Sequence, residues 1–97
     1  MRKPFIAGNW KMHKTSSEAV ETAGELVKLV AATTNVDIMI APPYTALNLV
    51  AQEIMGTAVE LGAQNLDWHP EGAYTGEISA SMLTATGCRY VIIGHSE

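Results

Sequence analysis

The sequence predicts an α/β fold with a parallel sheet, and two observations support this prediction. Four short apolar runs alternate along the 97 residues with segments of helical spacing. Strands that alternate with helices are joined by right-handed crossovers, which make the strands parallel. The last run, residues 90–93, is continuously apolar, as a strand buried on both faces is. No change of composition divides the chain, so residues 1–97 are expected to belong to a single domain.

The four predicted strands are short, and residues that interrupt extended structure follow them. The four strands are centred near Phe5, Ile38, Val59 and Val91. In the first, polar and apolar residues alternate from Asn9 to Met12, so the side chains of Asn9 and Lys11 are expected to point the same way. The second stops at Pro42 and the last at Gly94. Four parallel strands leave two open edges, which parallel sheets rarely have. Half of a closed barrel is therefore the simplest interpretation.

Two helices are predicted between the first three strands. Thr15 and Glu18 have the spacing of a capping box, and the helix that they begin is expected to weaken near residues 33–35. A second apolar pattern of helical spacing starts near Thr45. It ends before Gly56, because glycine is typical of the position that follows a helix.

A long loop, residues 65–78, is predicted before the third helix, which Ser79 would cap and Gly87 would end. The loop is rich in turn-forming and aromatic residues. A solvated loop is one interpretation. However, Trp68 and Tyr74 exposed together would form an unusual apolar patch for a monomer, which favours an interface.

Composition excludes several classes of protein. The net charge is −4, with 6 basic and 10 acidic residues, so no basic surface for nucleic acid or an anionic membrane is expected. The single cysteine, Cys88, fits a reducing compartment. The start of the chain does not read as a signal peptide, and no apolar stretch approaches the ~20 residues of a membrane span. A cytoplasmic protein is expected. The three histidines and one cysteine lack metal-ligand spacing, so no metal site is expected.

The residues after the last apolar run are the best candidates for chemistry. His95, Ser96 and Glu97 can all exchange hydrogen bonds or protons, and parallel α/β folds build active sites at the carboxyl ends of their strands. On residue type alone, a structural histidine held by backbone groups explains His95 as well as a catalytic one does. Lys11 reads most simply as an exposed loop lysine, and Asn9 as a turn residue.

Four motifs in register resemble the triosephosphate isomerase family. They are Ala7–Met12, Gly62–Asn65, Gly72–Ser79 and Val91–Glu97. The resemblance covers the whole chain and implies a (β/α)8 TIM barrel of roughly 250 residues. This chain would supply about its first four strands and three helices. The resemblance also implies an enzyme of glycolysis and gluconeogenesis that interconverts dihydroxyacetone phosphate and D-glyceraldehyde 3-phosphate through an enediol(ate), with no cofactor.

The resemblance assigns roles to individual residues. It implies that Asn9 and Lys11 bind the phosphorylated triose, and that Lys11 and His95 are catalytic. Ser96 and Glu97 would give polar support beside them, although a surface pair at the end of the chain is the simpler interpretation of these two. The glutamate base and the phosphate-binding loops of the family match no part of this sequence.

The resemblance also gives the loop a function. In the family, the residues that correspond to Tyr74, Thr75, Gly76 and Glu77 insert into a partner subunit of a homodimer. Thr75, at the tip, would reach toward the catalytic end of that partner. Loop 72–77 is therefore expected to form the dimer interface.

Two other functions are weighed against the isomerase. A non-catalytic barrel fragment would associate with itself or complement a C-terminal half through its open sheet edges. Another phosphate-handling barrel enzyme is disfavoured, because four motifs match in register. A general base typically contributes ~10²–10⁴-fold to a rate, so the 97 residues alone are expected to be inactive.

Overall fold

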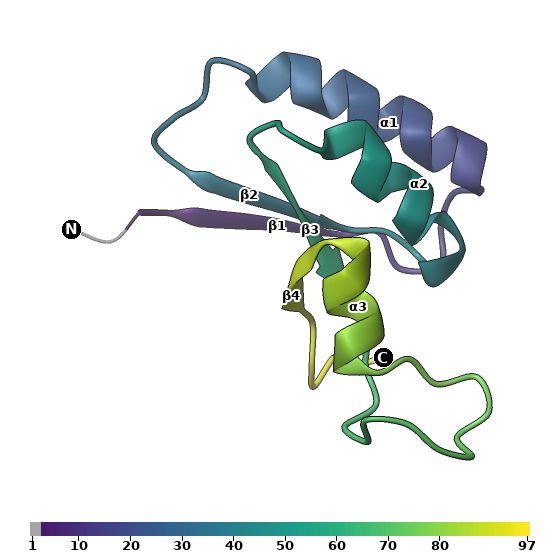
Figure 1. Cartoon of the computed structure of the whole chain (residues 1–97). Coiled ribbons are helices and arrows are strands. Elements are labelled where there is room, and N and C mark those ends of the chain that lie inside the picture. Colours follow the sequence, from purple (N-terminus) through teal and green to yellow (C-terminus); the bar gives the residue numbers. More distant parts are fainter. Residues whose placement is uncertain (1–2) are drawn as a thin grey trace.

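Four parallel strands form one sheet in the order β1-β2-β3-β4, with three helices packed on one of its faces (Figure 1). The computed structural model describes residues 3–97; Met1 and Arg2, on which the expectation about a signal peptide partly depends, lie outside it. The elements in chain order are β1 (Phe5–Asn9), α1 (Ser16–Val30), β2 (Asp37–Ala41), α2 (Tyr44–Ile54), β3 (Val59–Ala63), α3 (Ala80–Thr86) and β4 (Cys88–Val91). The predicted alternation of parallel strands and helices is confirmed.

The first helix begins at the predicted capping box. The Thr15 hydroxyl accepts a hydrogen bond from the Glu18 backbone N–H at 3.4 Å, and the Thr15 backbone N–H donates to the Glu18 carboxylate at 2.8 Å. The hydrogen bonds with Thr15 lower the pKa of Glu18, because they favour the ionised carboxylate. Farther along, α1 buries Ala19 and Ala23 completely in the core that it shares with α2.

The hydrophobic core lies between the helices and the sheet face that they cover. Its buried side chains come from all three helices and from β2 and β3: Ala19, Ala23, Ile38, Ile40, Ala46, Leu47, Val50, Ile54, Val59, Leu61, Ala63 and Leu83. Gly87 follows α3 with φ +109°, and its backbone N–H donates to the carbonyls of Leu83 and Thr84. This left-handed residue ends the helix and turns the chain into β4.

The other face of the sheet is concave. A Cβ atom at Gly62 would lie 2.4 Å from the sulfur of Met39, so glycine leaves room there for a buried side chain of the neighbouring strand. The rings of Phe5 and Tyr90, which lie on β1 and β4, have centroids 5.0 Å apart. Three strand spacings of ~4.8 Å would separate these edges by roughly 14 Å in a flat sheet. The sheet therefore curves toward this face.

Two predictions about strand ends are wrong. β1 ends at Asn9, because Lys11 has a left-handed backbone conformation with φ +53° and cannot continue an extended alternation. β4 begins at Cys88, two residues before the predicted run. It is also not buried on both faces, since Tyr90 and Val91 are 37% and 36% exposed. The reason is that β4 is an edge strand of the described sheet.

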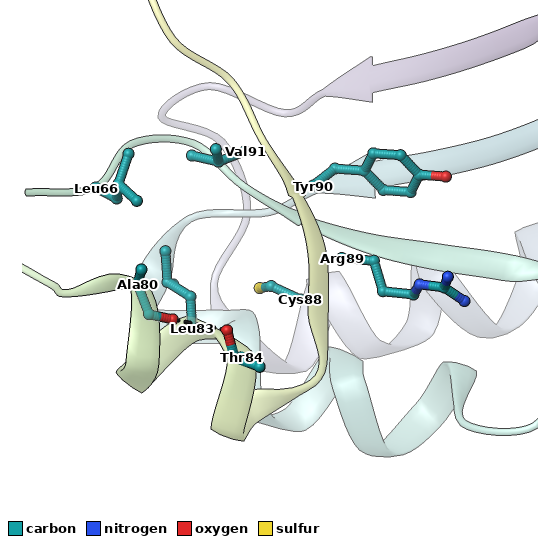
Figure 2. Close-up of a pocket in the computed structure, with 8 residues that line it drawn as sticks. All are labelled: Leu66, Ala80, Leu83, Thr84, Cys88, Arg89, Tyr90 and Val91. Carbon is teal, nitrogen blue, oxygen red and sulfur yellow. Dashed lines mark hydrogen bonds between the residues drawn. The ribbon is translucent and has the colours of Figure 1, made fainter. Parts of the chain in front are cut away.

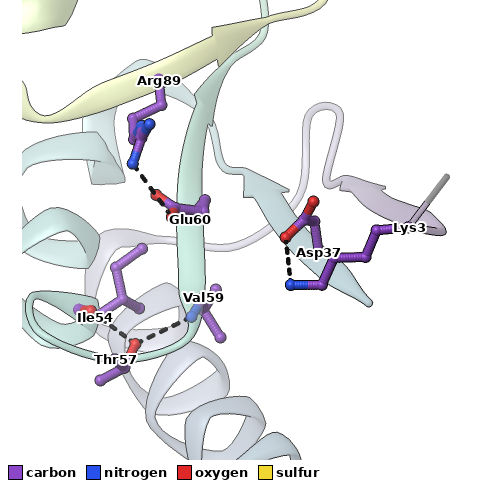
Figure 3. A network of polar contacts seen from close by, with 7 residues as sticks. All are labelled: Lys3, Asp37, Ile54, Thr57, Val59, Glu60 and Arg89. Atoms are coloured by element: carbon purple, nitrogen blue, oxygen red, sulfur yellow. Dashed lines mark hydrogen bonds and ion pairs between the residues drawn. The ribbon is translucent and has the colours of Figure 1, made fainter. Parts of the chain in front are cut away.

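Polar contacts join the strands near the edge of the sheet at which they begin (Figure 3). Lys3 lies 3.2 Å from the carboxylate of Asp37 and links β1 to β2, whereas Arg89 lies 3.6 Å from Glu60 and links β4 to β3. Before β3, the Thr57 hydroxyl bridges the end of α2 and the first residue of the strand. These contacts support the fold and leave the carboxyl edge for chemistry.

Candidate active site

The segments that follow the strands leave the sheet from its carboxyl edge. Backbone hydrogen bonds extend the pairing beyond the strand ends: Trp10 N–H donates to Ala41 at 3.1 Å, and Ile92 N–H donates to Ala63 at 2.9 Å. These bonds keep the residues after β1 and β4 at the same edge as the end of β2 and β3. Side chains from distant parts of the sequence can therefore meet there.

Lys11 lies in the turn after β1, and polar groups hold its backbone on both sides. Its N–H donates to the side-chain oxygen of Asn9 at 2.9 Å. Its carbonyl accepts a hydrogen bond of 2.8 Å from the side-chain nitrogen of Gln64, which also donates to Ala41 at 2.9 Å. Two carboxamides thus fix the peptide groups that flank the Lys11 Cα.

The Lys11 side chain reaches the end of the described chain. Its ammonium nitrogen lies 3.6 Å from Glu97 Oε2, to which the Ser96 hydroxyl also donates at 3.3 Å. The pKa of Glu97 is lowered by a backbone hydrogen bond within the residue first and by the positive charge of Lys11 second. The carboxylate is therefore ionised at neutral pH. Since both side chains are about half exposed, at 55% and 52%, a small ligand can approach them from solvent.

His95 lies in the segment between β4 and Glu97 and is exposed. Gly94, with φ +64°, turns the chain just before it. The charge of His95 makes the smallest contribution to the lowered pKa of Glu97. Because Glu97 contacts Lys11, the backbone segment that carries His95 lies at the same edge of the sheet as Lys11.

The structure brings four of the predicted site residues into direct contact: Asn9, Lys11, Ser96 and Glu97. The expectation that Asn9 and Lys11 point the same way along one strand is wrong, because the chain turns between them. Gln64 joins this group, although it was predicted only as part of the Gly62–Asn65 motif and was given no role of its own. A polar side chain directly after an otherwise buried strand was the available signal, but its partners are far away in the sequence.

Loop 65–78 is ordered by contacts among its own residues and extends away from the sheet below α3 (Figure 1). Asp67 N–H donates to the Ile78 carbonyl at 2.8 Å and closes its base. His69 Nδ1 lies 2.6 Å from the Asp67 carboxylate, and its ring stacks on Tyr74 with centroids 3.9 Å apart. Hydrogen bonds with His69 lower the pKa of Asp67. Trp68 beside them is 83% exposed, so the loop presents aromatic surface, as predicted.

A groove of about 160 Å³ between α3 and β4 is separate from this site (Figure 2). The Cys88 side chain points into it toward α3, whereas Arg89 and Tyr90 point away. Burial raises the pKa of the Cys88 thiol, so the thiol stays neutral and is a poor nucleophile at neutral pH. The groove is mostly apolar, and Cys88 is the ionisable side chain that points into it.

The part of the chain that the structure describes contains neither a metal centre nor a membrane-spanning helix. Within residues 3–97, no cluster of three or more histidine, cysteine, aspartate or glutamate side chains is arranged to hold a metal ion. None of the helices in this range has the length and apolar character needed to cross a bilayer.

Comparisons with known proteins point to one family. A family model described as triosephosphate isomerase matches residues 4–97. The triosephosphate isomerases of Caldanaerobacter subterraneus subsp. tengcongensis and Geotalea uraniireducens are 55% and 53% identical to the whole chain, which covers 39% of each. The crystal structure of triosephosphate isomerase from Bartonella henselae has a TM-score of 0.82 at 42% identity, with 98% of this chain and 39% of that one covered. The chain thus spans about two-fifths of the length of these relatives.

Proposed function

Because the chain belongs to the triosephosphate isomerase family, whose members are cofactor-independent isomerases, we propose that it supplies one side of a triosephosphate isomerase active site. The observation that carries this proposal is the Lys11–Glu97 contact of 3.6 Å. It joins the segments after β1 and β4, which are the outer strands of the sheet, at its carboxyl edge. Active sites of parallel barrels lie at that edge.

The proposed reaction interconverts dihydroxyacetone phosphate and D-glyceraldehyde 3-phosphate, as in glycolysis and gluconeogenesis. A proton leaves a carbon next to a carbonyl, and negative charge develops on the oxygens of an enediolate. Lys11 offers a compact positive charge to the phosphate and to the developing oxyanion. His95 donates a hydrogen bond to the enediolate oxygens and moves protons between them.

Asn9 has a second task in this proposal. Its side-chain oxygen accepts the Lys11 N–H, so the amide nitrogen is the end that faces a substrate as a donor. Ser96 and Glu97 position the charge of Lys11 and do not act as the base. The base and the phosphate-binding loops would come from the rest of the barrel.

We also propose that the parent enzyme is a cytosolic homodimer whose interface includes loop 72–77. The ordered base of the loop and the exposed rings of Trp68 and Tyr74 support a protein contact there. Thr75 and Gly76 form the turn at its tip. In this arrangement the tip meets the partner subunit near its catalytic edge.

The test is a chimeric enzyme in which this chain replaces the matching segment of the Geotalea uraniireducens triosephosphate isomerase. We expect isomerase turnover in a coupled assay. We expect Lys11→Met to lower kcat/KM at least ~100-fold, because one group that stabilises the developing charge typically contributes 10²–10³-fold. Lys28→Met and His13→Gln, at exposed positions outside the site, are matched controls. A folded chimeric enzyme without turnover, or full activity in Lys11→Met, contradicts the proposal.

The second candidate is a non-catalytic fragment that pairs through its open edges. It is favoured by the exposed apolar side chains of β1 and of the segment around β4, among them Ile6 at 57% and Ile93 at 72% exposed. The two candidates differ in one respect. If the chain supplies part of an isomerase site, turnover of the chimeric enzyme requires Lys11. If the chain is only a pairing fragment, Lys11 is not required.

A further inference from the structure

We infer that Gln64 is a positioning residue for the catalytic ammonium of Lys11. This inference rests on the proposed function and assigns a role to a side chain that does not itself touch the substrate. Two features support it, the backbone conformation of Lys11 and the hydrogen bonds that hold it.

Lys11 has a backbone conformation that its residue type disfavours. Its φ of +53° lies in the left-handed region, where the Cβ atom of a non-glycine residue crowds the following carbonyl. Such a conformation persists only where surrounding groups hold it in place. The conformation matters here because it sets the direction in which the lysine side chain leaves the turn.

Gln64 supplies the hold on the carbonyl side. A primary amide has two N–H donors, and Gln64 uses them for Lys11 at 2.8 Å and Ala41 at 2.9 Å. Ala41 is fully buried at the end of β2, and Gln64 itself directly follows β3. The Lys11 carbonyl is therefore tied to the two central strands of the sheet. Asn9 holds the N–H on the other side of the same residue.

The side chain of Lys11 depends on this hold because little packs around it. It is 55% exposed, and its ionic contact with Glu97 at 3.6 Å is open to solvent. Exposed ion pairs of this kind orient side chains weakly. Lys14, a second lysine between β1 and α1, also has a left-handed backbone with φ +77°. In the described chain the Gln64 carboxamide donates to the carbonyls of Lys11 and Ala41 and not to that of Lys14, so the hold by Gln64 is specific to Lys11.

Removal of the Gln64 donors should let the Lys11 peptide relax to a common conformation. The ammonium would then leave the place where charge develops. A misplacement of about 1 Å in an active site can cost ~100-fold in rate. We therefore expect Gln64→Met, which keeps the length of the side chain but has no donor, to lower kcat/KM of the chimeric enzyme ~10- to 100-fold.

A double-mutant cycle with Lys11→Met separates positioning from a general structural role. If Gln64 acts through Lys11, Gln64→Met has no further effect once the ammonium is gone. If Gln64 only stabilises the fold, the two losses multiply. The affinity for inorganic phosphate, measured by calorimetric titration, gives the same cycle without turnover. Gln52→Met, an exposed glutamine of α2, is the matched control and should leave both quantities unchanged.

An inactive parent chimera contradicts the proposed function itself. If the unmutated chimera is active but the losses of Gln64→Met and Lys11→Met multiply, only the role of Gln64 is overturned. The same holds if Gln64→Met keeps full activity. Gln64→Glu serves if Gln64→Met does not fold, because it keeps the shape but turns an acceptor oxygen toward two carbonyls. A loss of phosphate affinity on Gln64→Met that occurs when Lys11 is present, and not in Lys11→Met, supports the inference.

Discussion

Lys11 and Glu97 join two ends of the chain, but their contact contributes little to folding. Both side chains are about half exposed, and water and salt screen the attraction between such charges. The pKa of Glu97 is lowered, first by a backbone hydrogen bond within the residue and then by the charge of Lys11, so the carboxylate keeps its charge to a lower pH than an ordinary glutamate does. The ion pair is lost when the carboxylate takes up a proton.

Gly62 gives a prediction at the residue scale. A Cβ atom there would lie 2.4 Å from the sulfur of Met39, which is 3% exposed. We expect Gly62→Ala to destabilise the chimeric enzyme by ~1–3 kcal/mol, the usual cost of overpacking, in urea unfolding. The loss should shrink in a Met39→Ala background, which removes the crowded atoms.

Gly24 provides the contrast for this prediction. A Cβ atom at Gly24, within α1, would meet the carboxylate of Glu53 at 2.8 Å. That group is the far end of a flexible, exposed side chain and can move away. Gly24→Ala should therefore be neutral or stabilising, because alanine favours a helix by ~1 kcal/mol over glycine. Equal losses at Gly62 and Gly24 would contradict the role given to Met39.

Sequence reasoning was most accurate for residues whose motif is local and least accurate for those held by distant partners. The segment around Lys11 was recognised from its motif, but its left-handed backbone was not. That conformation depends on Gln64, which is 53 positions away. No spacing rule connects two such residues before the strands are paired.

Among the elements, the capped helix ends were predicted well because their determinants lie within one turn, whereas α1 ends at Val30, before the residues 33–35 at which it was expected to weaken. Thr15 with Glu18, Ser79 and Gly87 all have the predicted capping roles. The start of β4 was predicted less well. The apolar run at residues 90–93 marks the most hydrophobic part of the segment, whereas pairing with β3 begins at Cys88 and includes an irregularity opposite Leu61 and Gly62.

The capping box gives a prediction at the scale of the element. Thr15→Ala removes the acceptor for the Glu18 N–H, and loss of an N-cap typically costs ~1 kcal/mol. For a protein of 150–250 residues this corresponds to a fall in Tm of roughly 2–4 °C, measurable by calorimetry of the chimeric enzyme. Thr34→Ala, at an exposed position after α1, should leave Tm unchanged.

The capping box of Thr15 and Glu18 also predicts how thermal stability depends on pH. The pKa of Glu18 is lowered in the folded state, so the contribution of its ionised carboxylate to the stability of the fold is fully present above the ordinary glutamate pKa. It is lost as the pH falls through the lowered value. The difference in Tm between the unmutated chimeric enzyme and its Thr15→Ala variant should therefore become smaller at acidic pH. A difference that stays constant from pH 7 to pH 3 would contradict this explanation.

At the scale of the whole molecule, the topology followed from the alternation of elements and from the four motifs in register. The prediction of the first four strands and three helices of a (β/α)8 TIM barrel is confirmed by the match to the Bartonella henselae structure. The open edge of β4 was predicted, but the exposure of its Tyr90 and Val91 side chains was not, since burial depends on neighbours that the local sequence does not describe.

The isolated chain gives the last prediction. We expect the 97-residue polypeptide alone to show no isomerase turnover, because a missing general base typically costs ~10²–10⁴-fold. Its exposed apolar edges should also make it associate, which light scattering would detect as a mass that rises with concentration. Turnover at the rate of the chimeric enzyme would contradict the first expectation, and a mass independent of concentration the second.

The ring contact between Phe5 and Tyr90, at 5.0 Å, has a consequence for assembly. It joins the two outer strands across the concave face, so the sheet is already curved within this chain, before any further strand is added. The strands that complete the barrel would therefore pair with a sheet that is already curved. A curved sheet favours one docking geometry for these strands over the many that a flexible, flat sheet would allow.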